Sequence, residues 1–226
     1  MSALPAFDPR LVPVEAIDHH LPPLQPEHLH EQALRERFSQ TLVWTPEFHS
    51  DPSISPRTPV PAAVLVPLVL RDEVMVLLTE RTTRMSSHSG QVAFPGGKSD
   101  PEDSDLQATA LREAQEEIGL EHHFVEIVGS LPIYTTVTAF QVTPVVALVA
   151  PGFQVVPNPD EVARVFEVPL AFLMNPANHR RHAVEWQGVR REWLSMPYQD
   201  TEQEHFIWGA TAAMLRNLYG FLRAPL

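Results

Sequence analysis

Two apolar runs rich in β-branched residues open the central part of the chain. They cover residues 62–70 and 74–79 and are separated by the polar triplet 71–73, a pattern that predicts a β-hairpin. Residues 124–130 and 141–149 are also rich in valine and isoleucine and predict two more strands. The core of the protein is therefore expected to begin near residue 60 and to contain a sheet.

A helix is predicted where apolar residues recur every four positions along the middle of the chain. The stripe consists of Leu106, Ala110, Ala114 and Ile118. Ser104 followed by Gln107 matches a capping box, so we expect the helix to begin near Asp105. Gly119 is placed to end it, because glycine is common just after the last helical turn.

The last third of the chain predicts a turn, a second hairpin and two helices. The turn is at residues 158–160, and a short helix is expected over 170–174. The hairpin covers residues 180–193, around Gln187 and Gly188. A C-terminal helix is expected over residues 205–222, and we interpret its apolar stripe as core packing.

Residues 1–58 are predicted to be an extension of the domain formed by residues 59–226. Prolines divide its first part into short pieces, and residues 27–39 predict one helix before a proline-rich loop at 45–59. We expect a packing arm or a homodimerisation arm here rather than a substrate-binding element.

Composition and charge exclude several classes of protein. The chain has 226 residues, 44% of them apolar, and a net charge of −12, which argues against a nucleic-acid partner. There are no cysteines, so disulfides and thiolate nucleophiles are excluded. The longest apolar run, residues 60–70, is too short to cross a bilayer, and the first ten residues do not resemble a signal peptide. We therefore expect a cytoplasmic protein without a membrane partner.

Three carboxylates crowd one side of the central helix. Glu113, Glu116 and Glu117 fall within an arc of roughly 100°, where like charges destabilise a helix. One interpretation is a solvated acidic face paired with Arg112. A bound Mg²⁺ explains more, because hard cations prefer carboxylate oxygens, and the preceding Gly96-Gly97 pair would let backbone carbonyls approach the ion.

The same residues carry a resemblance to a known family. Residues 112–120 read REAQEEIGL and resemble the REUxEExGU half of the Nudix box, where U is apolar. The resemblance implies an α/β/α sandwich around a mixed sheet and hydrolysis that depends on Mg²⁺ or Mn²⁺. It also implies that Glu113 and Glu117 are metal ligands, that Glu116 is a further ligand or a base, that the Gly97 carbonyl is a ligand and that Arg112 positions the glutamates.

The front half of the box departs from the family pattern. Ser104 stands where the family has its first glutamate, and the loop from Gly97 to Arg112 is one residue longer than the common form. The nearest acidic residues are Asp103 and Asp105. We assign the role of the missing glutamate to Asp103.

The segment just before the box narrows the resemblance to the coenzyme A pyrophosphatases. LLTER at residues 77–81 and FPGG at residues 94–97 are similar to that subgroup's signature, although Ser86 replaces its second arginine. The resemblance makes Arg81 and Arg84 candidates for phosphate contacts. Without it, these arginines would be interpreted as solvated loop residues.

Two further groups of residues can be assigned. Some Nudix hydrolases take a base from a late loop, and Glu161 is the candidate here; the alternative is an acid that stabilises a turn. The histidines show no metal-binding motif, so we expect surface residues rather than zinc ligands at His122, His123, His179 and His182.

The implied reaction is cleavage of the pyrophosphate bond of coenzyme A or a derivative. The products would be 3′,5′-ADP and a 4′-phosphopantetheine species. Two alternatives remain: hydrolysis of another nucleoside diphosphate compound such as ADP-ribose, and a non-catalytic Nudix-fold module that senses a nucleotide. The intact set of three glutamates counts against a pure binding module.

Overall fold

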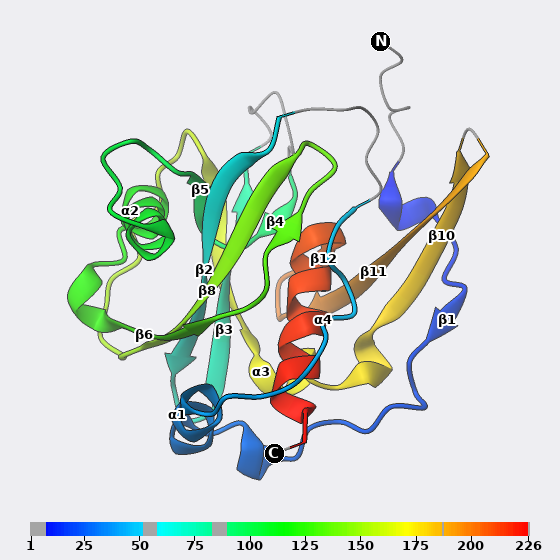
Figure 1. Ribbon diagram of the computed structural model, residues 1–226, viewed down its shortest axis with the longest axis horizontal. Coiled ribbons are helices and arrows are strands. Elements are labelled where there is room, and N and C mark those ends of the chain that lie inside the picture. The colour runs from blue at the N-terminus through cyan, green and yellow to red at the C-terminus, as the bar shows by residue number, and fades with distance from the viewer. Residues whose placement is uncertain (1–7, 52–57, 83–89, 187, 226) are drawn as a thin grey trace.

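A mixed eight-stranded sheet forms the centre of the molecule (Figure 1). The computed structural model describes residues 8–51, 58–82, 90–186 and 188–225. Strands β4-β3-β2-β8-β6 follow one another across the sheet, while β5, β7 and β9 pair with β2, β8 and β3. The strands are β2 (Val60–Leu70), β3 (Val74–Arg81), β4 (Val92–Ala93), β5 (Gly96–Lys98), β6 (Val125–Ser130), β7 (Tyr134–Thr135), β8 (Phe140–Val149) and β9 (Val162–Pro169).

The predicted strands are confirmed, and their alternation creates two cores. The β2–β3 hairpin forms as expected, and β2 pairs with β8 in parallel from Val60 opposite Phe140 to Val69 opposite Val149. Because neighbouring residues in a strand point to opposite faces, Leu65 enters one apolar cluster and Val66 the other. Each face of the sheet therefore needs a covering layer.

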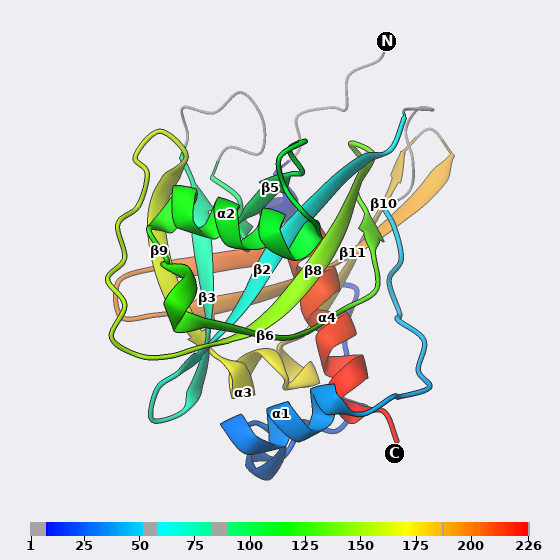
Figure 2. The same cartoon turned by 60° about the vertical axis from the view of Figure 1, so that its left-hand side comes forward.

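Helix α2 (Leu106–Ile118) covers one face (Figure 2), and α4 (Gly209–Arg223) covers the other. Ala110, Ala114 and Ile118 on α2 are buried against the sheet, as their spacing predicts. The expected α/β/α sandwich around a mixed sheet is confirmed. One detail is corrected: the N-cap is Asp105, whose carboxylate accepts the Ala108 N–H at 2.8 Å, rather than Ser104.

A second sheet of four strands lies beyond α4 (Figure 1). Its order is β1-β10-β11-β12, formed by β1 (Ala16–Ile17), β10 (Arg180–Trp186), β11 (Val189–Gln199) and β12 (Glu204–Trp208). The predicted hairpin at residues 180–193 is its β10–β11 pair. The expected helix over 205–222 was wrong at its start, because residues 204–208 pair with β11 and α4 begins only at Gly209.

Short helical segments complete the architecture. The short helix at residues 170–174 is confirmed as α3 (Leu170–Leu173). Single 3-10 turns occur at η1 (Pro9–Leu11), η2 (Pro26–His28), η3 (His122–Phe124) and η4 (Pro176–Asn178). Within the described residues, no helix has both the length and the apolar character needed to span a bilayer.

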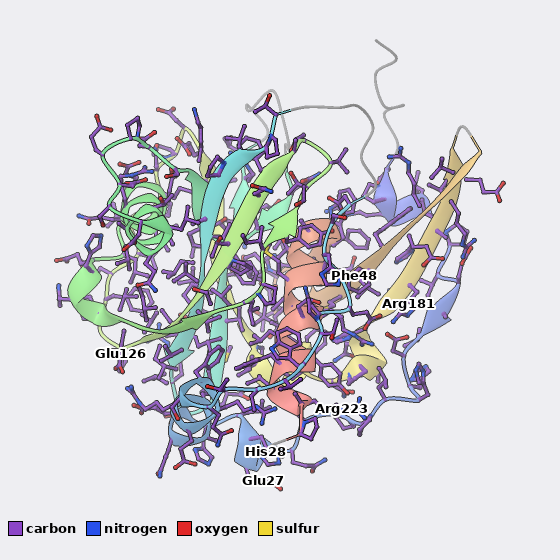
Figure 3. All side chains as sticks on the ribbon, viewed as in Figure 1. Glu27, His28, Phe48, Glu126, Arg181 and Arg223 are labelled. Atoms are coloured by element: carbon purple, nitrogen blue, oxygen red, sulfur yellow. The ribbon has the colours of Figure 1, made fainter. Side chains whose placement is uncertain are left out.

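The N-terminal extension packs along α4. The helix expected over residues 27–39 is shorter, because α1 (Glu31–Ser39) starts after His30, whose ring nitrogen accepts the Ala33 N–H. Phe48 lies in front of α4 (Figure 3), and its backbone makes two hydrogen bonds with the Asn217 amide, at 3.1 and 2.7 Å. The Tyr219 hydroxyl donates to the Pro22 carbonyl at 2.7 Å.

A cluster of charged side chains, in which Arg216 and Asp18 are buried and Glu47 is exposed, joins the extension to the rest of the fold. Arg216 on α4 contacts Asp18 at 3.1 Å and Glu47 at 2.7 Å. Its guanidinium also donates to Nδ1 of His179, whose other nitrogen bonds the Leu173 carbonyl. Burial lowers the pKa of His179 to about 4, so the ring stays neutral at physiological pH.

The predicted surface position holds for two of the four histidines. His122 and His123 are exposed. His179 and His182 are buried instead. Nε2 of His182 lies 2.8 Å from the Ser195 hydroxyl, and Nδ1 lies 3.0 Å from the Val12 carbonyl. Both buried rings are therefore held by hydrogen bonds inside the fold, which short-range sequence patterns did not indicate.

Candidate active site

Strand β5 and helix α2 bring the Gly96-Gly97 pair against two of the predicted metal ligands. One carboxylate oxygen of Glu117 accepts the Gly96 N–H at 3.2 Å. A Cβ atom placed on Gly97 would lie 2.6 Å from the Glu113 carboxylate, so any larger residue there would push that carboxylate aside. The β5 backbone and two α2 carboxylates thus line one small region.

Arg112 connects the acidic residues with one another. Its Nη1 donates to Glu113 at 3.0 Å and to Glu116 at 3.2 Å, and its Nη2 donates to the Lys98 carbonyl at 3.2 Å. Glu116 keeps 60% of its side chain exposed, whereas Glu117 is only 4% exposed. The three glutamates therefore differ in environment, and Glu116 lies at the outer edge.

Asp103 holds the other side of Arg112. The two side chains make parallel hydrogen bonds of 2.9 and 3.0 Å, and the Arg112 guanidinium keeps the pKa of Asp103 well below its usual range. Asp103 also accepts from the Thr109 hydroxyl and from the Asp100 N–H. The aspartate side chain is shorter than the family's glutamate and its loop is one residue longer, and Asp103 still reaches Arg112.

The contribution of Thr109 was not predicted. Its hydroxyl donates to Asp103 at 2.8 Å and its side chain is buried. Thr109 lies three residues before Arg112, so both side chains leave the same face of α2. That spacing is the signal that could have identified it.

Burial sets the protonation of the inner carboxylates. The pKa of Glu117 is raised to about 7, mainly by burial and further by the charges of Glu113 and Glu161, although Arg81 and the Gly96 N–H oppose the shift. Burial also raises the pKa of Glu113, with Glu116 and Glu161 adding to it. A group of acids that resists ionisation in this way would be stabilised by a cation.

Arg81 brings the upstream segment to the same place. It ends β3, and its Nη1 lies 3.7 Å from a Glu117 carboxylate oxygen. Its side chain is 23% exposed, so it lies at the surface of the acidic region. Arg84 and Ser86 lie outside the described residues.

Glu161 approaches the acidic residues from the loop before β9. Its carbonyl accepts the Thr82 N–H at 2.9 Å, next to Arg81. Its charge contributes to the raised pKa of both Glu113 and Glu117. The predicted late-loop acid therefore lies close enough to interact electrostatically with the two inner glutamates.

The donors present suit a hard divalent ion. Among the described residues, no group of three or more acidic or histidine side chains is arranged to hold a metal ion by itself. The Glu113 carboxylate nevertheless lies against the Gly97 backbone, and the Glu117 carboxylate lies 3.2 Å from the neighbouring Gly96 nitrogen. Mg²⁺ usually takes one or two carboxylates and completes its shell with water and substrate phosphates, so these residues fit such an ion.

Comparisons with known proteins agree with the resemblance of residues 112–120 to the Nudix box. A family model described as NUDIX domain matches residues 59–206. The chain is 44% identical to an uncharacterized Nudix hydrolase NudL from Enterobacter sp. (strain 638) and 45% identical to one from Cronobacter sakazakii. Each match covers 70% of this chain and 80% of the relative.

A solved structure shows a weaker likeness. The crystal structure of a C. elegans Ap4A hydrolase binary complex is 22% identical, with a TM-score of 0.42, and the match covers 49% of this chain and 80% of that one. Nudix hydrolases generally use divalent metal ions. From its acidic helix, the family match and the two NudL relatives, the chain belongs to the Nudix family and is a Nudix hydrolase.

Proposed function

We propose that this Nudix hydrolase cleaves the pyrophosphate bond of coenzyme A or a derivative, using Mg²⁺ or Mn²⁺. The products are 3′,5′-ADP and a 4′-phosphopantetheine species. The observation that carries the proposal is the contact between Arg81 and Glu117, at 3.7 Å. It joins the segment that resembles coenzyme A pyrophosphatases to the acidic helix that resembles the Nudix box.

Support for a diphosphate substrate comes from the charges around this contact. Arg81 is a partly exposed cation at the edge of an acidic group, which suits a phosphate that must lie beside a metal ion. Arg84, three residues further on, is the second proposed phosphate contact. The coenzyme A assignment itself depends on the resemblance of residues 77–97.

Each acidic residue receives a role in this proposal. Glu113 and Glu117 hold the ion together with the Gly97 carbonyl, and Arg112 keeps the glutamates in place. Glu116, at the exposed edge, is a further ligand or the base. Glu161 is the second candidate for the base, because its charge acts on both inner glutamates. When bound, the ion supplies charge neutralisation on the diphosphate and a water of lowered pKa.

The proposal is tested by turnover. Purified protein is incubated with coenzyme A and Mg²⁺ or Mn²⁺, and products are separated by chromatography, with ADP-ribose as a second substrate and the Glu117→Gln variant alongside. We expect 3′,5′-ADP from coenzyme A with the unchanged protein and none with the variant. Cleavage of ADP-ribose alone would overturn the substrate assignment while keeping the chemistry. Ligand binding without turnover of any diphosphate would overturn the catalytic proposal.

A further inference from the structure

The loop between β8 and β9 crosses the C-terminal end of α2. The Val156 N–H donates to the Ile118 carbonyl at 2.9 Å, and the Asn158 N–H donates to the Glu117 carbonyl at 2.8 Å. Gly119 leaves room for this crossing, because a Cβ atom there would lie 3.0 Å from Val156. We call residues 155–162 the α2 strap.

The α2 strap supplies what the end of this helix lacks. The last turn of α2 contains no basic residue, although its carbonyls and Glu116 and Glu117 make that end negative. Two strap N–H groups satisfy carbonyls that would otherwise need water or a cation. The strap is therefore attached to the backbone of a proposed metal ligand.

Asn158 is the residue where the strap turns toward Glu161. Its carbonyl accepts the N–H of Glu161 at 3.1 Å and that of Val162 at 2.8 Å. Its side-chain oxygen accepts the Asp160 N–H at 3.1 Å. A single residue thus bonds the backbone of Glu117 on one side and that of Glu161 on the other.

The far side of Glu161 is held by Thr82, the residue that follows β3. Its carbonyl accepts the Thr82 N–H at 2.9 Å, one residue beyond Arg81. A chain of backbone hydrogen bonds therefore connects three residues assigned to the site. It runs from Glu117 through Asn158 to Glu161, and from Glu161 to Thr82, the neighbour of Arg81. Glu113 and Glu117 are positions within α2 and are held by that helix, whereas the place of Glu161 depends on the turn at Asn158.

We infer that Asn158 is a positioning residue, which holds Glu161 in register with the metal-binding end of α2 through its turn. The inference rests on the proposed function, since Glu161 needs a fixed place only if its carboxylate acts in the reaction. The Asn158 side chain contributes by stabilising the turn, and its loss leaves Glu113 and Glu117 in place. The expected effect is therefore on turnover rather than on binding.

The test compares Asn158→Ala with two matched variants of the full chain. Asn158→Asp keeps the side-chain oxygen that accepts the Asp160 N–H, and Asp160→Ala removes an exposed side chain from the same turn. For Asn158→Ala we expect kcat to fall about ten- to a hundredfold on coenzyme A with Mn²⁺, as for a misplaced catalytic group, with KM within about twofold. Asn158→Asp should restore most of the loss, and Asp160→Ala should resemble the parent.

Hydrogen exchange provides a readout that does not need turnover. The amides of residues 160–162 should exchange faster in Asn158→Ala than in the parent, while those of α2 stay protected, which also shows that the variant is folded. A kcat within twofold of the parent, or an equal loss in Asp160→Ala, would overturn the inference. If the parent hydrolyses neither coenzyme A nor ADP-ribose, the proposed function fails, and unchanged exchange at residues 160–162 would then overturn the strap as well.

Discussion

Arg112 binds Asp103 through two parallel hydrogen bonds, which join Nε to Oδ1 at 2.9 Å and Nη2 to Oδ2 at 3.0 Å. The remaining guanidinium nitrogen is then directed to Glu113 and Glu116. Bidentate pairing of this kind fixes the plane of an arginine as well as its place. Asp103 therefore controls the orientation of the residue that holds the acidic group.

Asp103→Asn should reduce turnover. The amide removes the charge and one acceptor, so Arg112 is free to turn further toward the glutamates. We expect a loss of about 10–100-fold in kcat/KM, the usual effect of losing a partner that orients ligands. The measurement is steady-state hydrolysis with Mg²⁺, with Glu102→Gln, an exposed acid in the same loop, as the charge-matched control. Equal losses of kcat/KM in both variants would show that the effect comes from the negative charge of the loop as a whole and not from the pairing of Asp103 with Arg112.

Glu117→Gln should make the metal-free protein more stable at high pH. Burial raises the pKa of Glu117 to about 7 from 4.5, so the folded state holds a proton that the unfolded state releases. The folded state therefore loses stability as pH rises from about 4.5 to 7. Removing the ionisable group should gain on the order of 1–3 kcal/mol at pH 8 and nothing at pH 4.

Urea unfolding in EDTA at pH 4 and pH 8 measures this difference. Glu116→Gln is the matched control, because Glu116 is 60% exposed and its removal should leave the free energy of unfolding nearly unchanged. Excess Mg²⁺ should raise the melting temperature of the parent and not that of Glu117→Gln, because a ligand stabilises only the state that binds it. A Glu117→Gln protein less stable than the parent at pH 8 would contradict the assignment.

Gly97→Ala should abolish most activity without unfolding the protein. The added methyl group would lie 2.6 Å from the Glu113 carboxylate and must push it out of place. A displacement of about 1 Å can cost about a hundredfold in rate. Gly220→Ala, in α4, is the control, because its methyl group would meet the Trp44 ring at 3.6 Å, an ordinary van der Waals distance. Isothermal titration calorimetry should show weaker Mn²⁺ binding by Gly97→Ala than by the parent, and unchanged Mn²⁺ binding by Gly220→Ala.

Short-range patterns were sufficient for the centre of the site. The apolar stripe of α2 puts Glu113 and Glu117 at its edge, and in the structure Glu113 lies against Gly97 and Glu117 accepts the Gly96 N–H. The predicted cap, Ser104, was wrong by one residue, because the neighbouring Asp105 is an equally good capping type and its carboxylate is the one that reaches the Ala108 N–H.

Long-range contacts account for what could not be predicted. The apolar pattern of residues 205–208 is compatible with a helix and with a strand, and these residues form a strand because they pair with β11. His179 reads as a surface residue until Arg216, 37 positions away, is placed beside it. Phe48 and Asn217 are separated by 169 positions, so no local pattern joins the extension to α4.

Asn217→Asp should loosen that extension. The Asn217 amide donates to the Phe48 carbonyl at 2.7 Å and accepts the Phe48 N–H at 3.1 Å, and a carboxylate cannot make the first bond. Because Asn217 is buried, the unpaired carbonyl should cost about 1–3 kcal/mol in the free energy of unfolding. Removing residues 1–58 should cost more, since that face of α4 would meet water. Chemical denaturation of both variants checks the order, and a truncated chain as stable as the parent would show that the domain folds without its extension.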